Sequence, residues 1–276
     1  MKSLRFGTTA RILAVLTVLG LAVFPLYWML VTSLTSNNDL FAKHVHFWPD
    51  FSRLGIYART LGDHRVRTWL FNSFLLSAGT CLLTLILAVP AGYALSRFSF
   101  RGKTLVGIGL FLTQTLPEAL LVVPLFGMLR GAGLLNSRTG LIFADVAFVV
   151  PIAALVLKGA VDAVPRQLDE AARVDGCRPL GVLLRITLPL IAPSVAASAV
   201  IAFFGAWNEY VFAVTFIFAP SKQPASVGLA GFVGENITPL DTVMTVGILY
   251  TAPAVLFYLF AQRYVVAGMT AGGLKG

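Results

Sequence analysis

Charge is the scarcest property of this sequence. Only 12% of its 276 residues are Asp, Glu, Lys or Arg, whereas 57% are hydrophobic and the mean hydropathy is +0.84. Soluble domains carry about 25% charged residues, so a single soluble core of this length is excluded. The sequence also lacks the alternating segments of roughly ten residues that form a membrane β-barrel. A helical membrane protein is the class that these absences leave.

Cysteine and histidine are rarer still, with two and three residues. Cys81 falls in an apolar stretch and Cys177 in a charged one, so we expect no disulfide between them, and neither has a CxxC or neighbouring-His pattern. The histidines, His44, His46 and His64, all lie in one polar segment. No nucleophile–base pair or paired catalytic carboxylates accompany them, which argues against a membrane enzyme.

Long hydrophobic runs are abundant. A helix that crosses a bilayer needs about 20 largely apolar residues, and we place six such spans at 12–34, 70–96, 105–129, 140–161, 192–219 and 242–262. The first run is too long for a signal peptide and has no small-x-small cleavage site after it, so we interpret it as a retained anchor. The sequence predicts an all-α membrane protein with one transmembrane domain over 1–276.

The distribution of basic residues predicts the orientation of these spans. Thirteen of the 21 Lys and Arg residues lie in the N-terminus, the 97–104 turn, the 158–190 segment and the C-terminus. The remaining eight lie in 35–68, 130–139 and 220–240. Because basic residues concentrate on the cytoplasmic side, both termini are predicted to be cytoplasmic. Basic residues that flank spans serve orientation and lipid head groups, so the net charge of +9 does not indicate nucleic acid binding.

A charged segment, "VPRQLDEAARVDGCRPLGVLLRITLPLIAP", interrupts the apolar sequence between the fourth and fifth spans. Pro165 suits a first helical position, Asp169 and Glu170 favour the positive end of the helix dipole, and Gly176 suits a left-handed stop. The predicted helix of about ten residues is too short to be stable alone. Its acids and alanines differ from the Lys, Arg and bulky apolar residues of a helix that lies on lipid. Docking to a partner protein is the better interpretation.

The stretch "EAARVDGCRPLGVLLRITLP" resembles the EAA loop of the permease subunits of ABC importers. The matching positions are Glu170, Ala171, Ala172, Gly176, Ile186, Leu188 and Pro189. "NSFLLSAGTCLLTLILAVPAGYALSRFSFRGK", "QTLPEALLVVPLF" and "FFGAWNEYVFAVTFI" are similar to other spans of that family, and the end, "QRYVVAGMTAGGLKG", is similar to the MalG-type subset that serves carbohydrate import. Glu118 beside Pro117 departs from the pattern.

The resemblance implies the fold of an ABC importer permease, with a cytoplasmic coupling loop at 163–190 that docks on a separate ATPase. The residues expected to couple are Glu170, Ala171, Ala172, Asp175, Gly176 and Pro189, with Glu170 pairing with a basic residue and Ala171 and Ala172 forming the close-contact surface. The resemblance further implies a second, non-identical permease, two ATPase subunits and an extracytoplasmic sugar-binding protein. The location implied is the cytoplasmic (inner) membrane of a bacterium or archaeon.

We expect this chain to bind no cofactor of its own. "RGKT" at 101–104 offers the end of a phosphate-binding loop, but Arg97 occupies the place of the required glycine and no strand precedes it. ATP and Mg²⁺ are therefore expected on the partner ATPases. Within the membrane, polar residues near helix breaks are candidates for the substrate path: Asn208, Glu209, Gln114 and Glu118, with Asp145 and Thr113 beside them. The alternative is that these groups satisfy one another or free backbone groups.

Two other transport functions stay open. An ABC permease could serve a non-sugar solute, and the EAA loop alone does not exclude it, although the tail and the "WNE" stretch favour sugar. A transporter driven by an ion gradient would usually show internal repeats and membrane-embedded ion ligands, whereas the two halves of this sequence do not resemble each other.

Overall fold

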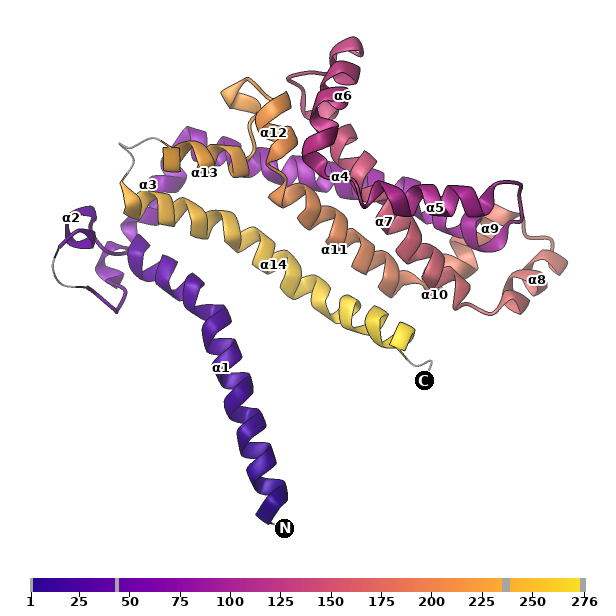
Figure 1. The fold of residues 1–276 in the computed structure, drawn as a ribbon, viewed down its shortest axis with the longest axis horizontal. Helices are drawn as coiled ribbons and strands as arrows, with labels where there is room; N and C mark the ends of the chain where they lie inside the picture. The colour runs from indigo at the N-terminus through magenta and orange to yellow at the C-terminus, as the bar shows by residue number, and fades with distance from the viewer. Residues whose placement is uncertain (1, 43–44, 235–238, 274–276) are drawn as a thin grey trace. The chain divides into compact units, whose positions relative to one another are not determined.

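The computed structural model describes residues 2–42, 45–234 and 239–273, and every regular element in these ranges is helical (Figure 1). The predicted all-α class is confirmed. The chain divides into two compact units. Unit 1 comprises residues 1–67 and 229–252, and unit 2 comprises residues 68–228 and 253–276.

Unit 1 is a long helix followed by short helices. It contains α1 (Lys2–Ser33), α2 (Asn37–Leu40), the 3₁₀ turn η1 (Phe51–Arg53), α3 (Gly55–Gly62), the end of α13 (Ala225–Gly234) and the first half of α14 (Leu240–Gly273). Ser33 Oγ lies 2.7 Å from Tyr57 OH, and Arg53 forms a 3.1 Å ion pair with Asp241. Hydrogen bonds from the side chain and backbone of Ser52 hold the pKa of Asp50 below its ordinary value. The Ser33–Tyr57 and Arg53–Asp241 contacts join segments that are far apart in the sequence.

Unit 2 is built on two long helices, α4 (His64–Arg97) and α7 (Arg138–Asp162). The others are α5 (Lys103–Thr113), α6 (Glu118–Gly131), α8 (Arg166–Val174), α9 (Pro179–Val182), the π turn η2 (Leu183–Thr187), α10 (Leu188–Leu190), α11 (Ala192–Asn208), α12 (Val211–Phe216), the 3₁₀ turn η3 (Pro220–Lys222) and the start of α13. α7 packs against α5 and α11. The second half of α14 lies along α11, where the Phe203 and Phe257 rings stack at 4.2 Å.

Four helices are long and apolar enough to cross a membrane within the described ranges: Thr9–Ser33, His64–Arg97, Arg138–Asp162 and Leu240–Leu259. They correspond to the first, second, fourth and sixth predicted spans. Two further candidates are bent pairs, α5 with α6 at 107° and Pro179–Leu190 with Ala192–Asn208 at 84°. The total is therefore four spans, or six if each bent pair is one span.

The third and fifth predicted spans are interrupted helices, and in the third span the interruption lies beside Pro117, where the sequence indicates a helix break. The predicted span 105–129 breaks between Thr113 and Glu118, because Pro117 lacks an N–H and disfavours helical backbone at the residue before it. The predicted span 192–219 ends as a helix at Asn208, and α12 begins separately at Val211. Hydropathy alone does not distinguish a continuous span from a broken one.

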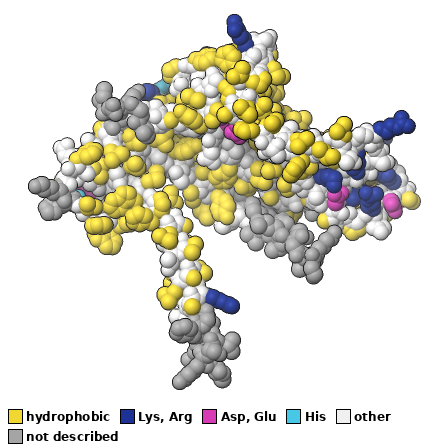
Figure 2. All heavy atoms as spheres, viewed as in Figure 1, with side chains coloured by type: hydrophobic (Ala, Val, Ile, Leu, Met, Phe, Trp, Pro, Cys, Tyr) yellow, Lys and Arg dark blue, Asp and Glu magenta, His cyan; other side chains and the backbone are white. Residues whose placement is uncertain are grey.

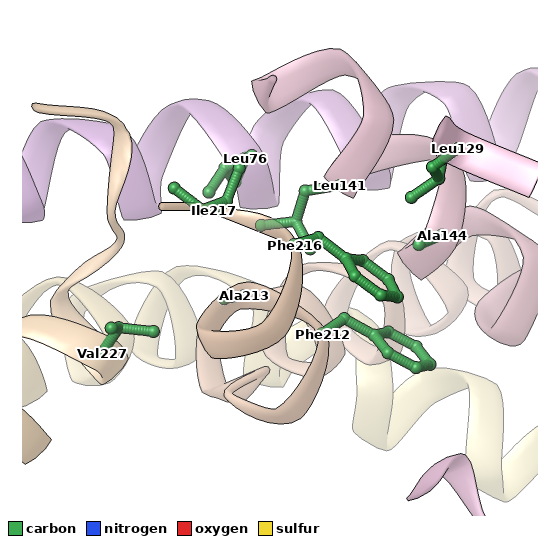
Figure 3. Packing of buried hydrophobic residues seen from close by; sticks show 9 residues of the cluster. All are labelled: Leu76, Leu129, Leu141, Ala144, Phe212, Ala213, Phe216, Ile217 and Val227. Carbon is green, nitrogen blue, oxygen red and sulfur yellow. The ribbon is translucent and has the colours of Figure 1, made fainter. Parts of the chain in front are cut away.

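An apolar cluster holds α12 against the long helices. It consists of Leu76, Leu129, Leu141, Ala144, Phe212, Ala213, Phe216, Ile217 and Val227 (Figure 3). The rings of Phe212 and Phe216 stack at 5.5 Å, and Figure 3 shows both extending to the same side of α12. Burial of these side chains stabilises a helix of six residues that would be unstable in isolation.

Asn136 forms a clasp between the α6–α7 connection and the segment after α12. Its N–H donates to Phe216 O (2.8 Å), its carbonyl accepts from Lys222 Nζ (2.7 Å), and its Oδ1 accepts from the N–H groups of Phe218 and Ala219 (3.0 and 2.9 Å). Asn136 has φ 53°, a left-handed conformation that asparagine tolerates better than most residues. The clasp therefore depends on both the side chain and the backbone of one residue.

A second cluster packs α4 against α7 at their other ends, with Ala88, Tyr93, Ala153, Ala154, Leu157, Val161, Leu183 and Ile191. Gly92 permits this close approach. A Cβ atom there would lie 2.9 Å from Leu157 Cβ and 2.9 Å from the Lys158 backbone nitrogen. Contacts this short require a backbone shift.

We therefore expect Gly92→Ala to lower the stability of the chain by about 1–3 kcal/mol, the usual range for an overpacked site. The matched control is Gly107→Ala, because a Cβ at Gly107 has no atom within 4 Å and alanine favours a helix. The measurement is the thermal midpoint of the purified protein in one detergent. Equal midpoints for the two variants would contradict the close approach at Gly92.

Candidate coupling surface and transport path

The charged segment folds as the sequence predicts. α8 covers nine residues, Arg166–Val174, with Pro165 immediately before it and Asp169 in its first turn. Gly176 has φ 83°, and the N–H of Cys177 bonds back to Ala172 O at 2.9 Å. The left-handed glycine stop is confirmed, and the helix starts one residue later than expected.

One face of α8 packs inside unit 2. Asp169 and Ala172, three residues apart, are each 4% exposed. The expectation that Ala171 and Ala172 together form an open contact surface is therefore corrected, because Ala172 is buried in its own chain. The buried Asp169 carboxylate makes an ion pair with Arg97, a contact across the sequence that the local pattern did not reveal. Thr187, which follows in the same segment, is also buried.

The opposite face of α8 is open. Glu170, Ala171 and Asp175 are exposed, and Val174 is 88% exposed. Figure 2 shows charged side chains gathered at the end of unit 2 that carries α8, beside a surface that is mostly apolar. Val174 is not among the coupling residues predicted from the sequence, although its spacing from Glu170 and Ala171 places it on the same helix face. We call Glu170, Ala171 and Val174 the open face of α8. Pro189 is exposed and follows the π turn.

The two candidate path residues at the end of α11 have different roles in the structure. Both carboxylate oxygens of Glu209 accept backbone N–H groups at the start of α12, from Phe212 at 2.5 Å and from Ala213 at 2.9 Å. Glu209 thus satisfies free backbone, the alternative that the sequence left open. Asn208 is exposed, and its Nδ2 donates to Phe204 O one turn earlier (3.0 Å).

The other polar candidates gather around the break between α5 and α6. Gln114 Nε2 donates to Phe148 O of α7 at 3.1 Å. Glu118 is exposed in the first turn of α6. Asp145 of α7 is 3% exposed and accepts from Thr80 Oγ1 at 3.4 Å. Asp145, Glu118 and Glu209 are close enough for their charges to interact. The fold thus brings together three acids that are separated in the sequence.

A polar cleft of 710 Å³ lies within unit 1, where the sequence indicated none. Asn37, Arg53, Arg59, Arg65 and Asp241 are among its lining residues. Among the described residues, no three His, Cys, Asp or Glu side chains could hold a metal ion together. His44 and the side chains of the predicted tail after Arg263 lie outside the part of the chain whose side chains are described.

Comparison with known proteins finds a matching family and similar full-length relatives. The family described as "Binding-protein-dependent transport system inner membrane component" matches residues 82–271. The sulfoquinovosyl glycerol transport system permease protein SmoH of Agrobacterium fabrum is 33% identical, over 98% of this chain and 95% of that protein. The trehalose/maltose transport system permease protein MalG of Thermococcus litoralis is 32% identical, over 96% and 97% respectively.

The fold is also found in a solved structure. A chain of a bacterial ABC transporter involved in the import of the acidic polysaccharide alginate superposes with a TM-score of 0.85, at 22% identity, over 96% of this chain and 98% of that chain. The helices, the loop containing α8 and the family match all agree with the resemblance seen in the sequence. The chain belongs to the family of inner membrane components of binding-protein-dependent transport systems, and it is a multi-pass membrane protein.

Proposed function

We propose that this chain is a permease subunit of an ATP-driven sugar importer, in which it forms half of the transmembrane path. The observation that carries the proposal is the open face of α8: a short helix, held in place by its own chain, exposes Glu170 together with Val174, which is 88% exposed. These side chains offer a partner protein one charged and one apolar contact. Relatives named for trehalose, maltose and sulfoquinovosyl glycerol support a carbohydrate substrate.

The energy comes from a separate ATPase subunit, which binds ATP and Mg²⁺. Glu170 pairs with a basic residue of that subunit, while Ala171 and Val174 contact its surface. Each permease chain offers one α8, so two permease chains are needed to engage two ATPase subunits. The second permease is a different protein, as the resemblance to the MalG-type subset implies.

The orientation rests on charge and on contacts within unit 2. Segments assigned to the cytoplasm meet, because Arg97 pairs with Asp169 and Ser96 Oγ donates to Asp162 at 2.6 Å. Segments assigned to the outside also meet, through the Asn136 clasp and the bond from Arg138 Nη2 to Ser221 O (3.1 Å). Both termini are then cytoplasmic by the positive-inside rule. The arginine-lined cleft of unit 1 faces outside, where a sugar-binding protein delivers the substrate.

The substrate path runs past the breaks in the helices. Asn208 is exposed beside the α11–α12 break, and Gln114 and Glu118 flank the α5–α6 break. Amide and carboxylate groups can hydrogen-bond sugar hydroxyls. Irregular backbone at membrane depth is tolerated where it lines a water-filled cavity or is buried in protein. Glu209 supports this path by capping α12.

The decisive experiment is to purify the tagged chain from its native membrane in mild detergent and identify its companions by mass spectrometry. We expect an ATPase, a second permease with an EAA loop and an exported binding protein. The binding protein is then screened against trehalose, maltose and sulfoquinovosyl glycerol, with a polyamine and phosphate as non-sugar probes. Recovery of the chain alone, with uptake independent of ATP, would instead support a gradient-driven transporter.

The open face of α8 predicts which substitutions release the ATPase. Val174→Asp places a charge in the contact, and Glu170→Arg reverses the expected ion pair. Each is expected to reduce the amount of co-purified ATPase about tenfold or more, as for a central interface residue that costs about 2 kcal/mol. Arg101→Glu is the matched control, because Arg101 is exposed in the neighbouring 97–104 turn and lies outside α8. Full retention of the ATPase by both α8 variants would contradict docking at this face.

Substitutions of Asn208 and Glu209 are expected to have different effects on stability and on sugar uptake. Glu209→Leu leaves two backbone N–H groups of α12 without their acceptor and should lower stability by about 0.5–2 kcal/mol, as for loss of a helix cap. Asn208→Leu should keep the thermal midpoint but reduce uptake of the sugar that the binding protein selects. Normal uptake by the Asn208 variant would remove this residue from the path.

A further inference from the structure

A buried ion pair joins the end of α4 to the coupling helix α8. Arg97 Nε lies 2.6 Å from Asp169 Oδ2, and the two side chains are 4% and 5% exposed. Arg97 Nη2 also donates to Val164 O at 2.8 Å, in the segment between α7 and α8. Among the described residues, Arg97 is the only cation that pairs with Asp169. The last residue of α4 thus holds both α8 and the segment that leads into it.

This pair is poorly explained as a device for stability. Neither Arg97 Nε nor either Asp169 oxygen has an aligned hydrogen bond within the described chain. Desolvating two charges is costly, and a buried ion pair often contributes no more to stability than an apolar pair would. A buried pair can instead specify one arrangement of its elements. Here the arrangement specified is the position of α8 on α4.

The surrounding polar contacts extend the same connection. Ser96 of α4 donates to Asp162 Oδ1 of α7 at 2.6 Å, and its carbonyl accepts from Arg166 Nη2 of α8 at 3.5 Å. Lys103 Nζ, at the start of α5, donates to Phe98 O at 3.1 Å. The Tyr93 ring packs edge-on against Phe98 at 5.9 Å. These contacts tie the end of α4 to α7 and to the start of α5, and the Arg166 bond ties it to the first turn of α8.

We propose that Arg97 and Asp169 are positioning residues that make α8 and α4 move together, so that a displacement of α8 is transmitted to the membrane part of the chain. The inference rests on the proposed docking of an ATPase on the open face of α8. Asp169 itself is turned away from that face, so its role is transmission within this chain rather than contact with the ATPase. Loss of the pair should uncouple the two helices without releasing the ATPase.

The chain contains its own reporter for this movement. Cys81 lies on α4, and its Sγ is 3.5 Å from Ala199 O of α11. Both cysteines are free, so replacing Cys177 by serine leaves one thiol in this chain. A shift of α4 along α11 changes the access of a small thiol reagent to Cys81. The rate at which N-ethylmaleimide labels Cys81, measured by mass spectrometry of its peptide, therefore reports the position of α4.

The experiment uses the complete complex in lipid nanodiscs, in the Cys177→Ser background, with and without Mg-ATP and vanadate. Nucleotide should change the labelling rate of Cys81 several-fold in the parent chain. In the double variant Arg97→Gln with Asp169→Asn, no buried charge is left unpaired, so folding is preserved. The ATPase should stay bound, but the ratio of labelling rates with and without nucleotide should fall to about 1, because the buried ion pair no longer fixes α8 on α4.

Lys158→Gln is the matched control, because Lys158 belongs to an ion pair at the same end of α7 whose side chains are 36% and 43% exposed. Exposed pairs contribute little, so this variant should respond to nucleotide like the parent. A full response in the double neutral variant, or an unchanged Cys81 rate in the parent complex, would overturn the proposal. Loss of the ATPase from a folded double variant would also overturn it. Failure of the parent chain to retain any ATPase would instead refute the docking function.

Discussion

A bilayer offers no water to hydrogen-bond free backbone groups, and the structure of this chain depends on that constraint. Where α11 gives way to α12, a side chain replaces lost helical bonds, because Glu209 accepts the N–H groups of Phe212 and Ala213 at the start of α12. At the α5–α6 break, Gln114 ties the end of α5 to Phe148 O of α7. The π turn η2 ends where the Leu188 N–H bonds to Leu183 O, one residue before Pro189, which has no N–H to give. The breaks are therefore supported, and they are also where polar side chains become available for a substrate.

The two faces of α8 separate two tasks that the EAA pattern combines in one short sequence. Glu170 and Val174 point away from the chain, whereas Asp169 and Ala172 are buried in it. Adjacent residues thus have different surroundings, because successive positions on a helix point about 100° apart. A substitution at Asp169 and one at Glu170 should produce different defects despite their proximity.

Local signals in the sequence were sufficient for much of this structure. Gly176 was recognisable because the left-handed stop is a property of one residue, and four straight spans followed from hydropathy. Contacts across the sequence were not recognisable. Nothing within the α8 pattern indicates that Arg97 lies opposite Asp169, so the sequence could not show which alanine is buried. A break near Pro117 was expected from the proline, but its angle was not, since proline is tolerated in membrane helices whenever neighbours supply the missing bonds.

The Asn136 clasp has a mechanical consequence. It binds the start of α7 to the segment after α12 through uncharged groups and one lysine, whereas the far end of α7 is bound to α4 by the Ser96–Asp162 hydrogen bond and by apolar packing. A rigid helix that is fixed at one end and displaced at the other tilts about its fixed end. If α8 drives the far end of α7, Asn136 is the pivot, and a small displacement of that end becomes a change of angle along the whole helix.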